Sequence, residues 1–124
     1  MSVQPKKVLA VDDSKLMLRM YEVMLRGTPL LLAENGQQAL QLLEQNPDVD
    51  LVLLDINMPV MNGLEFLAAL GQQGRLPGLP VIVVSTDGEE AQIEKGLAAG
   101  AVAYLTKPFD AERLRAAIAA LEAP

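Results

Sequence analysis

Short apolar segments alternate with longer amphipathic segments along the chain. Five of the apolar segments are each about as long as a β-strand, and they span residues 8–11, 30–33, 51–54, 81–84 and 102–105. The third and fourth are apolar at every position, without the alternation of a half-exposed strand. Continuous apolar runs of this length are typical of strands covered on both faces, as in a parallel sheet.

The segments between these strands carry apolar residues at helical spacing. The predicted apolar faces consist of Leu16, Met20 and Val23 in the first helix, Ala39, Leu42 and Leu43 in the second, Leu64, Leu67 and Ala68 in the third, Ile93 and Leu97 in the fourth, and Leu114, Ala117, Ile118 and Leu121 in the fifth. Gly96 weakens the fourth helix by about 1 kcal/mol relative to alanine. Asp110 is placed to cap the fifth.

Five strand–helix units in series predict an α/β fold with an open, doubly wound parallel sheet. The 124 residues suit a single domain over residues 1–124, and neither an internal repeat nor a linker interrupts them. Residues 71–80 are rich in glycine and proline and predict a loop before the fourth strand. Ligands of such sheets bind beyond the carboxyl ends of the strands, so the residues that follow each strand are the candidates for function.

The amino-acid composition excludes several classes of function. The net charge of −6 argues against a nucleic-acid partner, because phosphate contacts need clustered lysine and arginine. The chain has no cysteine and no histidine, which excludes disulfides, thiolate metal sites and histidine-dependent catalysis. No apolar run approaches the roughly 20 residues of a membrane helix, and no signal peptide is visible. We therefore expect a soluble, cytoplasmic protein without membrane insertion.

Polar residues follow four of the five predicted strands. They are Asp12 and Asp13 after the first strand, Asp55 after the third, Ser85 and Thr86 after the fourth, and Thr106, Lys107 and Pro108 after the fifth. Three carboxylates at one edge of a sheet repel one another, and a divalent cation offsets that repulsion. A site made only of oxygen ligands suits Mg²⁺. With a lysine and a hydroxyl beside it, such a site suits phosphoryl transfer to a carboxylate.

Each of these residues also has a plainer interpretation. Asp12 and Asp13 precede a helix and are placed to cap it. Asp55 is a typical turn former, the hydroxyls at positions 85 and 86 are placed to begin the fourth helix, and Lys107 fits a solvated surface lysine. The functional interpretation rests on the arrival of all of them at strand ends together.

Four ordered motifs resemble the receiver domain of bacterial two-component response regulators, most closely the stand-alone chemotaxis type (CheY-like). They are Val-Asp-Asp-Ser at 11–14, Leu-Asp-Ile-Asn-Met-Pro-Val-Met-Asn-Gly at 54–63, Val-Ser at 84–85 and Tyr-Leu-Thr-Lys-Pro-Phe at 104–109. The resemblance extends from residue 7 to residue 121. It implies the flavodoxin-like (βα)5 fold, for which strand order 2-1-3-4-5 is known.

The resemblance also implies a role for each matching position. Asp55 corresponds to the phosphoacceptor, and Lys107 to the lysine that contacts the phosphoryl group. The implied Mg²⁺ ligands are Asp13, Asp12 largely through a water, Asp55 and the backbone carbonyl of Asn57. Ser85 and Tyr104 correspond to the switch residues, Pro108 to a proline after a cis peptide bond, and Gly63 to a residue that keeps the loop backbone unhindered.

Thr86 departs from the commonest family pattern, in which a small alanine or glycine follows the switch hydroxyl. A β-branched side chain beside the phosphoryl group is expected to restrict the access of water or donor. Asn57 and Asp87 lie at positions that tune the lifetime of the phosphoryl group in the family.

The implied partners are a sensor histidine kinase or a histidine phosphotransfer protein, and an output protein that binds the surface of the fourth helix, fifth strand and fifth helix. The chain leaves no room for an output domain after the fifth helix, and this stand-alone length suggests chemotaxis or motility. A receiver excised from a larger regulator or hybrid kinase is the alternative.

Two further alternatives place the chain in other protein classes. A haloacid-dehalogenase phosphatase needs a second aspartate where Asn57 stands, and Asp12 and Asp13 would repel the phosphate of a flavodoxin's FMN.

Overall fold

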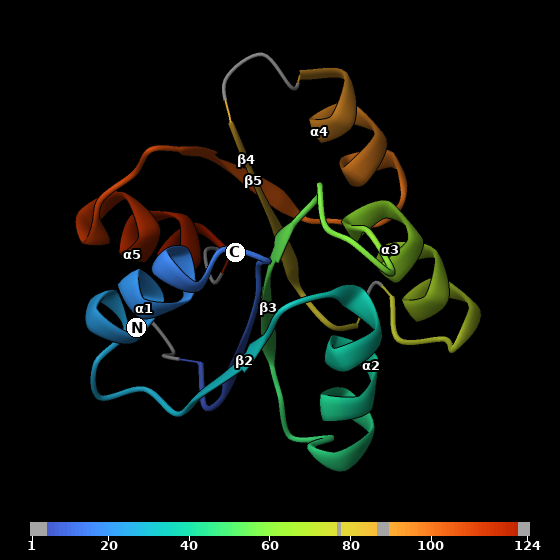
Figure 1. The fold of residues 1–124 in the computed structure, drawn as a ribbon, viewed down its shortest axis with the longest axis horizontal. Coiled ribbons are helices and arrows are strands. Elements are labelled where there is room, and N and C mark those ends of the chain that lie inside the picture. The colour runs from blue at the N-terminus through green and yellow to red at the C-terminus, as the bar shows by residue number, and fades with distance from the viewer. Residues whose placement is uncertain (1–4, 77, 87–89, 122–124) are drawn as a thin grey trace.

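The computed structural model describes residues 5–76, 78–86 and 90–121. Five strands form one parallel sheet in the order β2-β1-β3-β4-β5 (Figure 1). The strands are β1 (Val8–Val11), β2 (Leu30–Ala33), β3 (Leu51–Asp55), β4 (Val81–Thr86) and β5 (Ala103–Lys107). The helices are α1 (Lys15–Met24), α2 (Gly36–Gln45), α3 (Gly63–Gln72), α4 (Glu90–Ala98) and α5 (Ala111–Ala120). The predicted fold class and strand order are both confirmed.

Helices cover both faces of the sheet. Helices α1 and α5 lie on one side, and α2, α3 and α4 on the other (Figure 1). Alternate residues of β1 serve the two layers, because successive side chains of a strand point to opposite faces. Val8 and Ala10 pack with α1 and α5, whereas Leu9 and Val11 pack with α2 and α3. The continuous apolar runs of the central strands therefore fill two cores.

The strand ends differ from the sequence prediction. The third and fourth strands continue into their polar ends, to Asp55 and Thr86. The fifth is shifted, since Val102 lies outside it and is 45% exposed. Backbone pairing decides these bounds, because Thr106 and Lys107 pair with Ser85 and Thr86 of β4 in spite of their polarity.

The apolar face predicted for α1 is wrong. Leu16 and Val23 are 71% and 65% exposed, and Met20 is 38% exposed. The buried residues of α1 are instead Met17, Leu18 and Tyr21. The helix carries two apolar stripes, and packing against α5 and the sheet selects the one that contains the tyrosine.

Two smaller corrections concern α3 and α4. Ala68 is exposed, and α3 buries Phe66, Leu67 and Leu70. On α4 Ile93 is buried, as predicted, but Leu97 is 37% exposed. Gly96 does not break α4. A Cβ added there would lie 2.9 Å from Val83 Cγ2, so glycine lets the helix pack closely on β4.

Polar side chains fix where the helices begin. Ser14, Asn35 and Asp110 each accept a hydrogen bond from a backbone N–H in the first turn of α1, α2 and α5. Asn62 forms a capping box with Glu65 at the start of α3. The predicted cap at Asp110 is confirmed. None of the described helices is long and apolar enough to span a bilayer.

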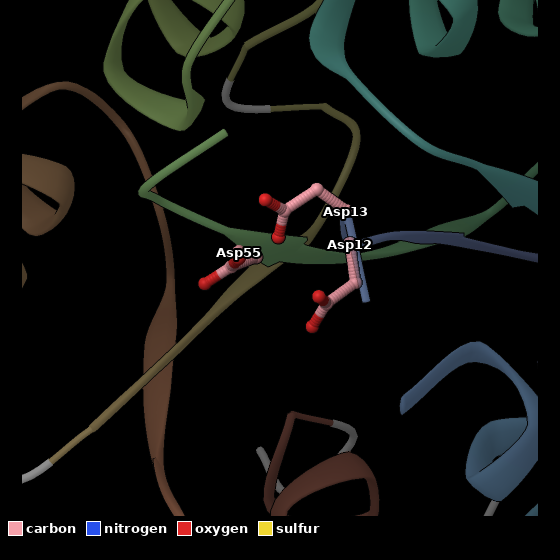
Figure 2. Close-up of side chains that lie close together, drawn as sticks. All are labelled: Asp12, Asp13 and Asp55. Atoms are coloured by element: carbon pink, nitrogen blue, oxygen red, sulfur yellow. The ribbon is translucent and has the colours of Figure 1, made fainter. Parts of the chain in front are cut away.

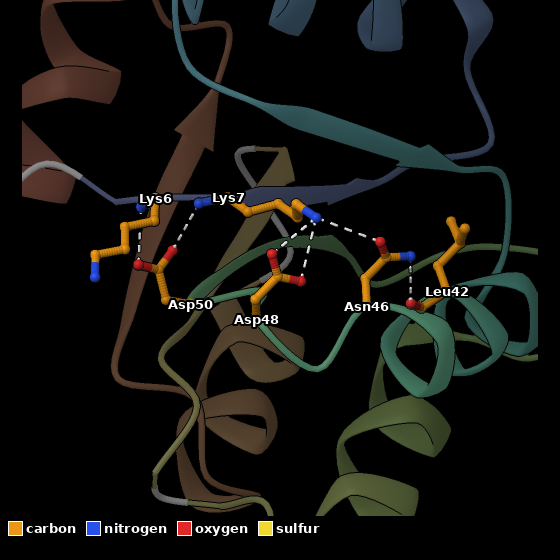
Figure 3. A network of polar contacts seen from close by, with 6 residues as sticks. All are labelled: Lys6, Lys7, Leu42, Asn46, Asp48 and Asp50. Atoms are coloured by element: carbon orange, nitrogen blue, oxygen red, sulfur yellow. Dashed lines mark hydrogen bonds and ion pairs between the residues drawn. The ribbon is translucent and has the colours of Figure 1, made fainter.

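A polar network closes the amino-terminal end of the sheet (Figure 3). The Asp50 carboxylate accepts hydrogen bonds from the backbone N–H groups of Lys6 and Lys7, at 2.8 and 3.1 Å. The Lys7 ammonium pairs with Asp48 at 2.9 Å and donates to Asn46 at 3.3 Å. The Lys7 hydrogen bond lowers the pKa of Asp48. This network joins the start of β1 to the α2–β3 connection, at the opposite end of the strands from their polar carboxyl ends.

Candidate metal and phosphoryl site

Three aspartates meet at the carboxyl ends of β1 and β3. These strands are neighbours, with Val11 paired to Leu54, so the residues that follow in each strand are brought together. Figure 2 shows the side chains of Asp12, Asp13 and Asp55 close to one another. Oxygen atoms of the three carboxylates all lie within 4.8 Å of one another. The sequence prediction that these residues converge is therefore correct.

The plainer interpretations of the acidic residues do not fit the structure. Ser14 is the N-cap of α1, since its Oγ accepts a hydrogen bond from the Met17 N–H at 3.2 Å. Asp12 is buried, at 1% exposure, and its Oδ1 accepts the Ser14 N–H at 2.9 Å. Asp55 is the last residue of β3 and is 8% exposed, so it is a strand residue rather than a turn former.

Lys107 completes the charge cluster from the end of β5. Its Nζ lies 2.9 Å from Asp12 Oδ2 and 3.6 Å from Asp55 Oδ1. The side chain is only 21% exposed, so this lysine is not a freely solvated one. Partial burial acts to lower the pKa of Lys107, but its hydrogen bond to Asp12 and the nearby carboxylate charges outweigh that effect and raise the pKa. The lysine is therefore held in its charged form.

Asp55 lies in an environment that disfavours its ionised form. Burial raises its pKa, the charge of Asp12 raises it further, and Asp13 adds a smaller effect in the same direction. Lys107 opposes these effects. The net result is a pKa of about 6, against an ordinary value of 3.8. One lysine thus compensates three carboxylates only in part, and the cluster favours an additional cation.

The donor set fits a hard divalent cation. All three side chains offer oxygen, and their oxygens lie within 4.8 Å of one another. Adjacent ligands in an octahedral Mg²⁺ shell lie about 3 Å apart, so small side-chain rotations would bring the carboxylates onto one ion. Asp12 already accepts one hydrogen bond at each oxygen, from Ser14 and Lys107. Its remaining lone pairs can accept a hydrogen bond from a water bound to the metal, as the family resemblance implies. Asp13 is exposed and free to turn toward an ion.

Gly63 packs directly on the backbone beside Asp55. A Cβ at this position would lie 2.6 Å from the Asp55 carbonyl oxygen and 2.8 Å from Ile56 Cα. The Gly63 N–H donates to the Ile56 carbonyl at 2.8 Å. Close approach, rather than an unusual backbone angle, is therefore the reason for glycine here. A larger residue would displace the end of β3 and with it the Asp55 carboxylate.

The hydroxyl residues of β4 lie next to this cluster. Asp55 pairs with Val84, so Ser85 is one position further along the adjacent strand. Ser85 is buried at 1% exposure, whereas Thr86 is exposed. Both belong to β4, so neither is a residue of α4 (Glu90–Ala98).

The remaining predicted positions belong to β5 and to the connections between elements. Tyr104 lies on β5 and is 51% exposed. The peptide bond between Lys107 and Pro108 is cis. Asn57 is exposed in the connection between β3 and α3. Asp87 lies outside the described residues.

Two residues near the site had no clear signal in the sequence. Tyr21 is 1% exposed, its ring centroid lies 6.1 Å from that of Phe109, and burial and the charges of Asp12 and Asp55 raise its pKa. The sequence does not predict its burial, because Tyr21 belongs to the second apolar stripe of α1. Val60 has a φ of 67°, which is rare for a β-branched residue. Only its position between a proline and a glycine hinted at a tight connection.

The parallel sheet, the acidic cluster and Lys107 together define a receiver-type signalling domain. The chain belongs to the response regulator receiver domain family, whose model matches residues 8–119. It is thus a phosphoacceptor rather than a turnover enzyme, which removes the phosphatase and FMN-carrier alternatives. The three aspartates form the acidic site typical of the metal sites of this family.

Similar proteins include both short and long chains. The chain is 38% identical over 112 residues to a chemotaxis protein CheY homolog of Campylobacter jejuni, covering 88% of this chain and 86% of that protein. A chemotaxis protein CheY4 structure from Vibrio cholerae superposes with a TM-score of 0.83 at 33% identity, covering 93% of this chain and 97% of the other. A rice two-component response regulator, ORR22, is 40% identical, but the match covers 88% of this chain and only 16% of that protein. The domain therefore also occurs within much longer regulators.

Proposed function

We propose that Asp55 accepts a phosphoryl group from a phosphohistidine and that the charged protein then binds an output partner. The observation that carries the proposal is the convergence of Asp12, Asp13, Asp55 and Lys107 at one edge of the sheet. We assign Mg²⁺ to the three carboxylates and the backbone carbonyl of Asn57. When bound, the ion supplies charge neutralisation for the incoming phosphoryl oxygens.

The chemistry requires little more than positioning. A carboxylate oxygen of Asp55 attacks phosphorus, the P–N bond to the donor imidazole breaks, and the imidazole leaves and takes up a proton. Lys107 is already within 3.6 Å of Asp55 and is placed to compensate the added negative charge. Ser85, one residue beyond the strand partner of Asp55, is assigned to donate a hydrogen bond to a phosphoryl oxygen.

The exposed face of α1 suits the donor protein, which is a sensor histidine kinase or a histidine phosphotransfer protein. A donor that reaches Asp55 must cover the edge of the sheet next to Asp13, where α1 begins. Leu16, Met20 and Val23 form an exposed apolar stripe along α1, and residues at this spacing share one helix face. Such a stripe favours packing against a helix of the donor.

Phosphorylation is proposed to shift the chain between two existing conformations. The new group carries about −1.5 to −2 charges, and Ser85 and Lys107 are drawn toward it. Tyr104 couples this change to the surface formed by α4, β5 and α5, where the output partner binds. The similarity to chemotaxis proteins supports a cytoplasmic role in chemotaxis or motility, carried out by residues 1–124 as one domain.

Intact-mass measurement tests the proposal. The protein is incubated with Mg²⁺ and acetyl phosphate, and a gain of one phosphoryl group is expected. The gain should disappear in Asp55→Asn and when EDTA replaces Mg²⁺. Asp48→Asn is the matched control, because Asp48 is an exposed aspartate at the opposite end of the sheet and should leave the gain intact. Full phosphorylation of Asp55→Asn, or no gain in the unmodified protein, would contradict the proposal.

A further inference from the structure

A groove lies between α4 and β5, on the side of the sheet covered by α4. Its volume is about 480 Å³, which is within the range of small-ligand sites and large enough for more than one side chain. The β-strands contribute Thr86, Tyr104 and Thr106, and α4 contributes Glu90, Ile93, Glu94 and Leu97. None of these residues belongs to the aspartate cluster, so the groove is separate from it, although Thr86 is the neighbour of Ser85 on β4.

The two kinds of side chain in the groove point to one chemistry. Ile93, Leu97 and Tyr104 supply apolar and aromatic surface, and Leu97 and Tyr104 remain 37% and 51% exposed. Glu90 and Glu94 lie one helical turn apart and are exposed on the same α4 face. None of the described residues that line the groove is basic. The groove therefore combines apolar surface with two carboxylates that repel each other.

We propose that this groove binds a partner segment through an arginine side chain flanked by apolar residues. The guanidinium would pair with Glu90 and Glu94, and its flat face would lie on the Tyr104 ring. Arginine suits this arrangement better than lysine, because it is planar, makes forked hydrogen bonds to carboxylates and stacks on aromatic rings. Its apolar neighbours would cover Ile93 and Leu97.

The same charges disfavour other occupants. An acidic segment would bring like charges against Glu90 and Glu94. A second copy of this chain, docked symmetrically through the groove, would place its own Glu90 and Glu94 against those of the first, since a two-fold interface sets the same surface against itself. Charge complementarity thus selects a cationic segment of a different protein.

The position of the groove connects it to the phosphoryl site. Thr86 and Thr106 line the groove, and Thr106 pairs with Ser85 between β4 and β5. An arginine segment in the groove therefore contacts the residue next to the proposed switch serine. Because coupling between two sites is reciprocal, a segment that binds the phosphorylated state better also favours phosphorylation. The groove lies on the surface of α4 and β5 that is proposed to bind the output partner, so this coupling and the assignment of the segment to that partner rest on the proposed function, whereas the binding chemistry of the groove does not.

Peptide pools test the groove directly. Three pools of fluorescent eight-residue peptides share randomised apolar flanks and differ at one central position, which is arginine, glutamine or glutamate. Binding is measured by anisotropy with untreated and beryllofluoride-treated protein. We expect the arginine pool to bind at least tenfold more tightly than the glutamate pool, with the glutamine pool between them, and the preference to weaken as salt is raised.

Variants that replace glutamate by uncharged glutamine test which residues cause the preference for arginine. Glu90→Gln with Glu94→Gln keeps side-chain size and helix propensity, and it should abolish the preference for arginine. Glu44→Gln with Glu112→Gln is the control, because these exposed glutamates lie on α2 and α5, and it should keep the preference. Equal binding of the three pools by the unmodified protein, or an undiminished preference in the α4 variant, would overturn the proposal.

Phosphorylation by acetyl phosphate is followed in the same samples. If the protein gains phosphoryl mass but shows no arginine preference, the groove proposal alone fails. If it gains no mass but prefers arginine, the proposed function fails while the groove chemistry stands. A coupling is shown when the arginine pool binds the beryllofluoride-treated protein more tightly than the untreated one, and unchanged affinity would overturn that step.

Discussion

The Lys107 ammonium forms its shorter ion pair with Asp12 rather than with Asp55. The Nζ–Oδ2 distance to Asp12 is 2.9 Å, and the Nζ–Oδ1 distance to Asp55 is 3.6 Å. The other oxygen of Asp12 is held by the Ser14 N–H at 2.9 Å. Asp12 thus anchors the lysine beside the proposed acceptor. In this position Lys107 stabilises the ionised acceptor and at the same time competes with any cation that binds the cluster.

Replacement of Lys107 by methionine separates these two effects. Loss of the positive charge should tighten Mg²⁺ binding by about tenfold or more, because two like charges that share the same carboxylates repel strongly at a partly buried site. Phosphorylation by acetyl phosphate should slow by a similar factor, since the compensating charge at Asp55 is gone. Calorimetry measures the first effect and intact mass the second. Weaker Mg²⁺ binding in Lys107→Met would contradict this assignment.

The raised pKa of Asp55 makes stability depend on pH. Between the ordinary value of 3.8 and the folded value of about 6, the folded state binds more protons than the unfolded state. Stability therefore falls as pH rises through this window and stays lower above it. In Asp55→Asn the free energy of unfolding at pH 8 should be higher by about 1–2 kcal/mol, allowing for solvent screening.

Urea unfolding at pH 8 and near pH 4.5 checks this expectation. The difference between the unmodified protein and Asp55→Asn should shrink toward the lower pH, and Mg²⁺ at pH 8 should stabilise the unmodified protein more than the variant. Glu44→Gln, an exposed change on α2, serves as the control. An equal pH dependence for the unmodified protein and Asp55→Asn would count against a raised pKa at Asp55.

Thr86 is expected to protect the phosphoryl group. It is the last residue of β4 and follows Ser85, and a β-branched side chain at this position is expected to restrict the approach of water to Asp55. Thr86→Ala should lose the phosphoryl group severalfold faster after acetyl phosphate is removed, as followed by intact mass. Thr28→Ala, in the connection between α1 and β2, should not change the rate. Equal dephosphorylation rates for Thr86→Ala and the unmodified protein would remove this role.

The exposed stripe of α1 gives a test of donor docking. Leu16→Gln changes a side chain that is 71% exposed, so the stability of the fold should change by less than about 0.5 kcal/mol. Phosphotransfer from a phosphorylated histidine kinase that serves the unmodified protein should slow by tenfold or more, while the reaction with acetyl phosphate is unchanged. Val102→Gln, also exposed but next to β5, is the control. If Leu16→Gln slows both reactions alike, the residue acts on the site and not on docking.

Val60 is expected to be a strained residue. Its φ of 67° places a β-branched side chain in the left-handed region, which costs about 1–2 kcal/mol. Asparagine tolerates this conformation, so Val60→Asn should raise the free energy of unfolding by about 1 kcal/mol in urea titrations. Val23→Asn has a similar exposed site, but in helix α1, and should lower stability slightly. A loss of stability in Val60→Asn would show that the loop is not strained.

The alternation of strands and helices was readable from hydrophobic pattern, because strands covered on both faces are apolar at every position. Hydrophobic pattern did not predict the buried face of α1 correctly. Its stripe of Leu16, Met20 and Val23 and its stripe of Met17, Leu18 and Tyr21 both have helical spacing, and local pattern does not distinguish them. The structure buries the second, since that stripe packs with α5 and Phe109 on the same face of the sheet.

Hydrophobic pattern and residue order are sufficient to predict that carboxylates, a lysine and a hydroxyl gather beyond the apolar runs, since parallel strands bring their carboxyl ends to one edge. Which of these groups contact one another, and how closely, depends on the tertiary structure. Lys107 pairs more closely with Asp12, Gly63 packs on the carbonyl of Asp55, and α4 presents two glutamates beside Tyr104. These relationships join residues far apart in the chain, and packing and charge balance between separate elements fix them.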